Sequence, residues 1–280
     1  MIIMDIKADN LYAFKNFHMN MSYPKKIVDS TISEEYLNDR QNFRYKKVNI
    51  IMGGNATGKT SLGKLLMTFT NYFEDGMYKR FTSKIDNEKK HAFLKIDFVT
   101  NENRLYRFQL SVRPKAEVEY KEDDVDINVY FTPIGIRDNY ENCAKRLDES
   151  DCNKISYDQI NTSGWYFSYP QDAWKKKTYI PIEENEKYLY ILKQILITLD
   201  PSIKDVIKVK EVDNTYAIKL DHCSVIIKDG QIANGEVLSS GTKAGLDISY
   251  IIASLVCDKH DLYYCDELFS YVNSDVEKAC

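Results

Sequence analysis

The sequence predicts an α/β fold with a mixed sheet, an antiparallel β portion at the N-terminus and an inserted middle region. Short apolar segments that alternate with polar residues crowd the first 112 residues, as half-buried strands do. Residues 59–73 and 242–257 instead repeat apolar side chains every three or four positions, which indicates two amphipathic helices. A glycine-rich loop stands directly before the first of these helices. We therefore expect an N-terminal lobe over residues 1–112, an insertion of unassigned role over residues 113–200 and a C-terminal lobe over residues 201–280.

Composition is that of an ordinary folded protein. The 280 residues, 44% hydrophobic and 29% charged, suffice for one large domain or two small ones. The formal charge of −4 excludes a basic footprint over the whole chain, so contact with nucleic acid would need a local patch. Six cysteines without C-x-x-C spacing favour the reduced cytosol. Because no basic and apolar leader and no apolar run of about 18 residues is found, we expect a cytoplasmic protein with no membrane partner.

The first segments predict strands. Residues 2–7 and 11–21 are apolar with partial alternation, which predicts two strands joined by a turn at Asp9 and Asn10. Residues 46–52, KKVNIIM, form a compact β-branched run that ends at two glycines. This pattern predicts a buried strand that enters a glycine turn.

A hairpin and a further strand follow the first helix. Residues 92–99 and 104–112 alternate around the turn TNEN, which predicts a hairpin whose strands each have one wet face. Residues 127–132 are compatible with another strand, and the remainder of 113–186 suggests no chemistry.

The C-terminal part alternates between helix and strand patterns. A helix is predicted over residues 186–199, followed by strand-like segments at 205–212, 215–220 and 224–230. After the helix at 242–257, a last strand is expected at 261–265.

The glycine-rich loop carries the strongest chemical signal. It fits the pattern G-x-x-x-x-G-K-[ST] at every fixed position, through Gly53, Gly54, Asn55, Ala56, Thr57, Gly58, Lys59 and Thr60. Backbone N–H groups of such a loop converge on a polyphosphate, and the following helix adds the positive end of its dipole. Lys59 can reach the β- and γ-phosphates, and the Thr60 hydroxyl can bind Mg²⁺. The alternative is a glycine turn before an amphipathic helix with a solvated lysine, but the flanking patterns favour a P-loop NTPase that binds ATP and Mg²⁺.

Two adjacent carboxylates follow the last predicted strand. Asp266 is placed to hold Mg²⁺, and Glu267 to orient or deprotonate the water that attacks the γ-phosphate. Alone, this pattern is also typical of a strand that ends in a polar loop. Together with the P-loop it favours a catalytic pair.

Three stretches resemble the ABC-class ATPases, within the RecF/SMC-like branch that includes bacterial AAA-type ATP-binding proteins of phage defence and the OLD family. Residues 10–17, NLYAFKNF, are similar to that branch's opening before the nucleotide loop. Residues 237–246, VLSSGTKAGL, resemble its signature motif, and residues 263–268 and 270–275 resemble the Walker B strand and the loop after it. The resemblance spans roughly residues 1–73 and 215–275 and leaves the middle uncovered.

The resemblance implies an ABC ATPase head that forms a homodimer with ATP between the two heads. Ser239, Ser240 and Gly241, which follow Leu238 in the position of LSGG, would face the ATP of the second subunit; their alternative role is an N-cap for the next helix. Ser61 joins the loop residues as a nucleotide contact. Lys59 and Glu267 would be catalytic, and Thr60 and Asp266 would bind the metal.

Two departures from the family pattern are apparent. Members carry a loop glutamine near Mg²⁺, but Gln109 falls in a predicted strand and Gln159 and Gln171 lie in segments without assigned structure, so none is chosen. Members also continue past Walker B to a histidine at the γ-phosphate, whereas His222 and His260 precede that strand and are expected at the surface or at a strand end. We therefore expect a piece of a longer protein, with an incomplete C-terminal lobe.

The favoured function is ATP binding and hydrolysis that gates a DNA-related activity or a nuclease or other effector, first in phage defence and second in DNA repair or maintenance. A nucleotide-sensing scaffold with little hydrolysis and a P-loop kinase stay open as alternatives. The kinase would not need the signature or Glu267.

Overall fold

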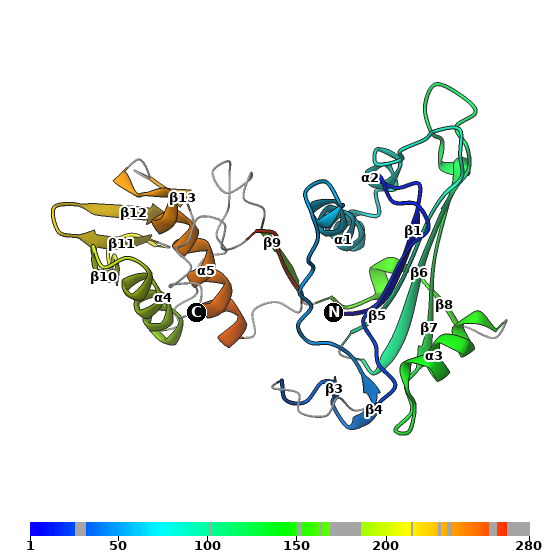
Figure 1. The fold of residues 1–280 in the computed structure, drawn as a ribbon, viewed down its shortest axis with the longest axis horizontal. Helices are drawn as coiled ribbons and strands as arrows, with labels where there is room; N and C mark the ends of the chain where they lie inside the picture. Colours follow the sequence, from blue (N-terminus) through cyan, green and yellow to red (C-terminus); the bar gives the residue numbers. More distant parts are fainter. Residues whose placement is uncertain are drawn as a thin grey trace. The chain divides into compact units, whose positions relative to one another are not determined.

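The computed structural model describes residues 1–25, 32–100, 102–149, 153–162, 164–168, 186–213, 215–228, 231–233, 237–257 and 262–267. By their internal contacts the residues form two compact units, Met1–Trp165 and Tyr166–Cys280, and each is described by itself (Figure 1). The predicted insertion does not form a unit of its own, since its first strands join the first unit. Among the described residues, no helix combines the length and apolarity needed to cross a bilayer.

The first unit is built on a six-stranded sheet in the order β2-β1-β5-β6-β7-β8, with every neighbouring pair antiparallel. Its strands are β1 Ile2–Asp9, β2 Phe17–Asn20, β5 Ala92–Val99, β6 Arg104–Val112, β7 Val125–Pro133 and β8 Asn153–Ile155. A separate hairpin joins β3 Tyr36–Leu37 and β4 Arg40–Arg44. The predicted strand pair at the N-terminus and the hairpin over 92–112 are confirmed, although the first connection runs on to Asn16 rather than turning at Asp9 and Asn10.

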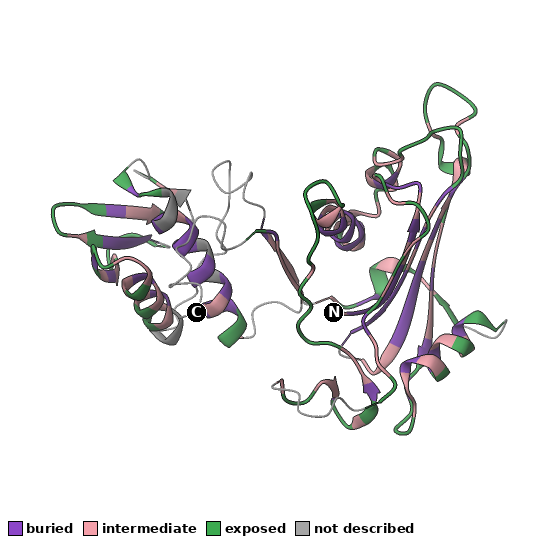
Figure 2. Ribbon diagram, viewed as in Figure 1, coloured by how far each residue is buried: buried purple, intermediate pink, exposed green. Residues whose placement is uncertain are grey.

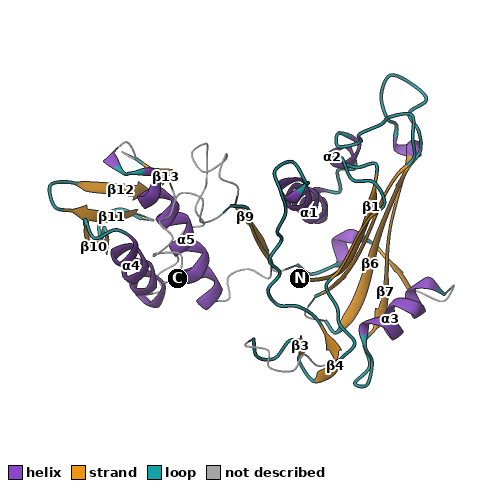
Figure 3. Cartoon of the chain, viewed as in Figure 1, coloured by secondary structure: helices purple, strands orange, loops and turns teal. Residues whose placement is uncertain are grey.

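Helices cover both faces of this sheet (Figures 1 and 3). The long helix α1 Lys59–Asp75, which confirms the helix predicted over 59–73, lies on one face, and α3 Tyr140–Asp148 lies on the other. Phe69 of α1 packs its ring against those of Phe98 and Phe108, with centroids 5.4 and 5.2 Å apart. The short helical segments are α2 Lys79–Thr82, η1 Glu122–Asp124 and η2 Tyr157–Gln159.

The prediction that β5 and β6 each keep one wet face is wrong. Both strands are buried over most of their length, as the purple central strands of Figure 2 show. The reason is that α3 covers the face of these strands that the sequence pattern predicted to be exposed to solvent. Asp97 and Arg107 lie on that face with 0% and 1% exposure, paired through two 2.8 Å hydrogen bonds, and the Tyr140 hydroxyl of α3 donates to Asp97. A buried charge pair satisfied in this way can occupy a position that usually holds an apolar side chain.

The prediction of a buried strand over residues 46–52 is also wrong. The segment has no strand structure, and Val48, Ile50 and Met52 are 59, 81 and 87% exposed. A strand needs a neighbour to take up its backbone hydrogen bonds. The backbone N–H of Lys46 still donates to Met21, but the order of the six-stranded sheet does not include the residues that follow.

The second unit combines a small antiparallel sheet with two helices. The sheet has the order β10-β11-β12-β13, and a two-stranded sheet joins β9 to β14. The strands are β9 Trp165–Ser168, β10 Ile203–Lys208, β11 Thr215–Leu220, β12 Ser224–Lys228, β13 Gln231–Ile232 and β14 Leu262–Cys265. The helices α4 Glu186–Leu199 and α5 Ser240–Val256 confirm the two helix predictions in this part. One apolar core joins both helices to the sheet through Leu192, Leu196, Ile203, Val206, Ile218, Val225, Leu238 and Leu246.

Candidate functional site

The predicted phosphate loop is an exposed turn that ends in α1. Gly58, the residue before the helix, has φ 97°, and Ala56 has φ 60°, so the chain twice enters the left-handed region. Thr57 Oγ1 donates to the carbonyl oxygen of Gly54 at 2.8 Å, which closes the turn on itself. A Cβ at Gly53 would stand 2.7 Å from Thr57 Oγ1, so a larger residue there would have to displace the Thr57 hydroxyl.

Lys59 lies over this turn. Its Nζ donates to the carbonyl oxygens of Gly53 and Gly54 at 2.8 and 2.9 Å. The ammonium group and the first N–H groups of α1 therefore converge on the same loop. The helix has no side-chain cap and no acidic residue in its first turn, so no carboxylate of that turn occupies the positive end of its dipole. Such an arrangement suits a polyphosphate.

Phe14 supports the loop from behind, which the sequence did not predict. A Cβ at Gly58 would stand 3.3 Å from Phe14 Cε1. The segment that carries Phe14 is held by Asn10, whose side chain donates to the carbonyl of Asn87 at 2.9 Å and accepts from its N–H at 2.8 Å. Phe14, within the stretch 10–17 quoted above for its family resemblance, thus packs against the predicted phosphate loop.

The two hydroxyl residues after Lys59 occupy the first turn of α1. Thr60 is exposed and Ser61 is half-buried. Both lie where a hydroxyl can reach a ligand at the N-terminus of the helix. Among the described residues, no group of three or more His, Cys, Asp and Glu side chains could hold a metal ion.

The signature stretch forms the start of α5. Ser239 is the N-cap, and its Oγ accepts from the backbone N–H of Thr242 at 3.0 Å. Ser240 and Gly241 begin the helix, and Leu238 is buried in the core of the second unit. The N-cap role that the sequence offered as the alternative is confirmed as local geometry, and a contact with ATP stays a prediction.

The acidic pair lies at the end of β14. Asp266 is 8% exposed, and its backbone N–H donates to the carbonyl of Ser168 at 2.9 Å. Glu267 is exposed and has φ 49°. The two carboxylates therefore differ in environment, one turned into the unit and one toward solvent.

The predicted site residues are divided between the two units. Lys59 and Thr60 belong to the first unit, and Ser239, Asp266 and Glu267 to the second. Their assembly into one catalytic site remains a prediction, because the structure describes each unit by itself.

The other candidates from the sequence are not brought to the loop. Gln109 lies inside β6 opposite Lys95, and Gln159 closes the short η2 helix. His222 is exposed in the turn between β11 and β12. Gln171, His260 and residues 270–275 lie outside the described residues.

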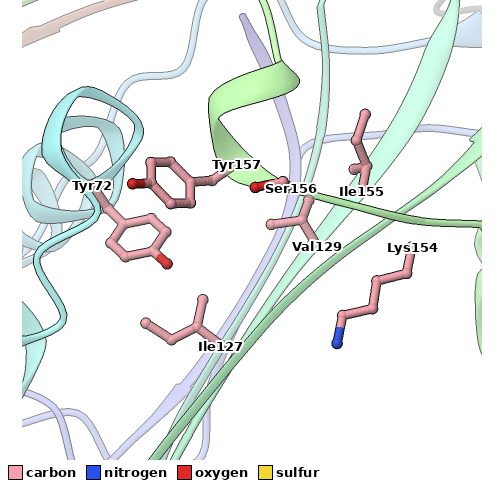
Figure 4. A pocket seen from close by; sticks show the side chains of 7 residues that line it. All are labelled: Tyr72, Ile127, Val129, Lys154, Ile155, Ser156 and Tyr157. Carbon is pink, nitrogen blue, oxygen red and sulfur yellow. The ribbon is translucent and has the colours of Figure 1, made fainter. Parts of the chain in front are cut away.

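A pocket of about 440 Å³ lies at the other end of α1 (Figure 4). Tyr72 is thirteen residues after Lys59, about 20 Å along the helix. The lining residues are Tyr72, Ile127, Val129, Lys154, Ile155, Ser156 and Tyr157. Burial, with a smaller contribution from Tyr157, raises the pKa of Tyr72 to about 12, so this phenol stays neutral at physiological pH. None of the predicted site residues lines the pocket.

Comparison with known proteins identifies the fold. No protein-family model matches the chain, and no curated protein matches it. The crystal structure of an SMC head bound to the C-winged helix domain of ScpA has a TM-score of 0.53 and 15% identity, over 99% of this chain and 83% of that one. The SMC head domain from Thermotoga maritima has a TM-score of 0.43 and 12% identity, over 99% of this chain and 81% of that one. On the first likeness, the chain has the fold of an SMC head, an ABC-type P-loop ATPase fold, as the sequence predicted.

Proposed function

We propose that the chain is an ATPase head that binds Mg²⁺-ATP at residues 53–60 and hydrolyses it. The observation that carries the proposal is the position of Lys59, whose ammonium lies on the carbonyls of Gly53 and Gly54 at the uncapped start of α1. A loop cation, the first N–H groups of a helix and the helix dipole together attract a polyphosphate. The SMC-head fold supports the choice of ATP hydrolysis over kinase chemistry.

The remaining roles follow from side-chain chemistry. Thr60 and Asp266 would bind Mg²⁺, which neutralises the charge that builds on the phosphates. Glu267, exposed at the end of β14, would orient or deprotonate the attacking water. Ser239, Ser240 and Gly241 would meet the ATP of a second copy, so that ATP drives a homodimer.

ATP-driven pairing would gate another activity. The sequence resemblance supports a DNA-related process or a nuclease or other effector, with phage defence as the first candidate process and DNA repair as the second. The similar solved SMC head is bound to a winged-helix domain, which makes a protein partner a candidate here too.

The test is isothermal titration with ATP and Mg²⁺. We expect the parent to bind and Lys59→Ala to lose measurable binding while its melting temperature stays unchanged, because Lys59 Nζ donates to carbonyl oxygens of an exposed loop. Lys89→Ala, which removes an exposed lysine elsewhere in the first unit, should bind as the parent does. Equal affinity in Lys59→Ala and the parent would show that the loop is not the nucleotide site.

A further inference from the structure

A chain of hydrogen bonds runs from the end of α4 to the start of α5. Asp200 directly follows α4, and its Oδ2 accepts from the hydroxyl of Thr242. The Thr242 hydroxyl oxygen also lies 2.8 Å from Ser239 Oγ. Ser239 in turn caps α5 by accepting from the backbone N–H of Thr242. This hydrogen-bond chain follows no sequence motif, because Asp200 and Thr242 are 42 residues apart.

The direction of the protons in this chain is fixed by Asp200. Its Oδ1 accepts from the N–H and the hydroxyl of Ser202 at 3.0 and 2.6 Å, so a carboxylate with both oxygens accepting suits the site. Burial alone would raise the pKa of Asp200, but the hydrogen bonds from Ser202 and Thr242 outweigh it and hold this pKa below its usual value. Asp200 is therefore ionised at neutral pH and can only accept.

This direction determines what the Ser239 hydroxyl can do. The single hydroxyl proton of Thr242 points to Asp200, so the hydrogen bond between Thr242 and Ser239 uses the proton of Ser239. Ser239 then has no proton left for another acceptor. It presents only a lone pair, which repels a phosphate oxygen.

The junction is tightly packed, so this hydrogen-bond chain occupies a defined position. A Cβ on Gly245 of α5 would stand 3.1 Å from Leu199 Cδ1 at the end of α4, and Thr242 is 5% exposed. The core of the second unit holds Leu238 on the other side of the cap.

We propose that Asp200 is a positioning residue that, through Thr242, holds the hydroxyl proton of the exposed residue Ser239 away from an incoming phosphate, and that opening this hydrogen-bond chain strengthens the engagement of ATP. The inference rests on the proposed function, in which Ser239 meets the γ-phosphate of the ATP bound by a second copy. Asp200 touches neither nucleotide nor metal in this account. It sets how readily Ser239 can donate.

Asp200→Asn should reverse the donor and acceptor roles along this hydrogen-bond chain. The single amide oxygen of asparagine would serve the two donors of Ser202, and the amide NH₂ would donate to Thr242. Thr242 would then donate to Ser239, and the Ser239 proton would become available to the phosphate. Thr242→Val should release the same proton by a different route, while the backbone N–H of residue 242 still completes the cap.

The experiment follows ATP-driven dimerisation by light scattering with Glu267→Gln present in the parent and in every variant to block hydrolysis, and the ATP affinity of the monomer is measured by titration. We expect Asp200→Asn and Thr242→Val each to lower the ATP concentration for half-maximal dimerisation about tenfold, the value of one hydrogen bond to a charged group. The double variant should need no less ATP for half-maximal dimerisation than either single variant, because both substitutions break the same hydrogen-bond chain. Thr242→Ser keeps the hydroxyl and should behave as the parent does. If Asp200 and Thr242 had only a structural role, their substitution would weaken ATP-driven dimerisation instead of strengthening it.

A second readout needs no ATP. In an NMR titration, Thr242→Val should raise the midpoint at which the Asp200 carboxyl protonates, because the hydrogen bond that lowers its pKa is removed. An unchanged midpoint would overturn the hydrogen-bond chain. Unchanged or weaker dimerisation in both Asp200→Asn and Thr242→Val, with the midpoint raised, would overturn the link to ATP. A parent that fails to dimerise with ATP would overturn the proposed function itself and, with it, the role of Asp200 in engagement.

Discussion

The two helices that follow the motif residues begin in opposite ways. Helix α1 starts after Gly58 in a left-handed conformation, with no side-chain cap and no acid in its first turn. Helix α5 starts after Ser239, which caps it, and the cap is tied to Asp200 through Thr242. The cap side chain of α5 satisfies one of the first N–H groups of that helix, whereas α1 has no cap side chain that could do so. Under the proposed function, the start of α1 would meet phosphate as it stands, whereas the start of α5 would first have to release Ser239 from Thr242.

The largest expected effect is on turnover, and it distinguishes the roles of the two carboxylates after β14. Glu267→Gln should lower turnover about a hundredfold or more and leave ATP affinity intact, because the residue acts on water and not on the nucleotide. Asp266→Asn should instead weaken the Mg²⁺-dependent part of ATP binding. Titration with and without Mg²⁺, beside a phosphate-release assay, measures both. Equal loss of affinity in the two variants would contradict the division of roles.

The next effect tests whether the open start of α1 depends on its left-handed glycine. Gly58→Ala should destabilise the first unit by about 1–2 kcal/mol, because φ 97° strains any residue with a Cβ and the new methyl would press on Phe14. ATP affinity should fall with it. Gly54→Ala is the matched control: a Cβ there meets no atom closer than 3.8 Å, and φ is not positive. Denaturant unfolding compares the two, and equal losses would show that the Gly58 conformation is not what shapes the loop.

The smallest effect concerns the cap of α5. Ser239→Ala removes the acceptor for the Thr242 N–H and should cost about 1 kcal/mol of unfolding free energy. ATP binding by the monomer should not change, since Ser239 belongs to the other unit. Denaturant unfolding of the variant and the parent measures the loss of stability. Titration with ATP measures the affinity of the monomer. A loss of monomer affinity would mean that the comparison assigns Ser239 to the wrong nucleotide.

Helices and strands that depend on the spacing of nearby apolar residues could be predicted from the sequence. The apolar repeat from Leu62 to Phe73 predicted α1, and alternation predicted both strands of the hairpin over 92–112. The wet face assigned to that hairpin was wrong because α3 arrives from later in the chain and buries Asp97 with Arg107. Helix α3 itself was missed among polar residues, although Asn139 as cap and Tyr140, Cys143 and Leu147 at helical spacing mark it.

Contacts between distant residues explain the remaining differences. Residues 46–52 have strand composition, but composition does not provide the neighbouring strand that the backbone needs. For the candidate site, the spacing of the P-loop motif was enough to place Lys59 and Thr60 at the start of a helix. Neither Phe14 behind Gly58 nor Asp200 behind Thr242 could be predicted, because each contact joins segments whose spacing follows no motif.

The most direct test of the account is the mass of the protein with ATP and Mg²⁺ when hydrolysis is blocked by Glu267→Gln. Light scattering should report a dimer in this variant. It should report a monomer when Ser239→Arg is added, because a bulky cation would prevent the start of α5 from closing on a phosphate. Ser239→Ala, which loses the same cap without the bulk, should still dimerise, and all three proteins should bind ATP equally in titration. A dimer that forms regardless of Ser239→Arg, or no ATP-dependent dimer in the Glu267→Gln protein, would contradict the account.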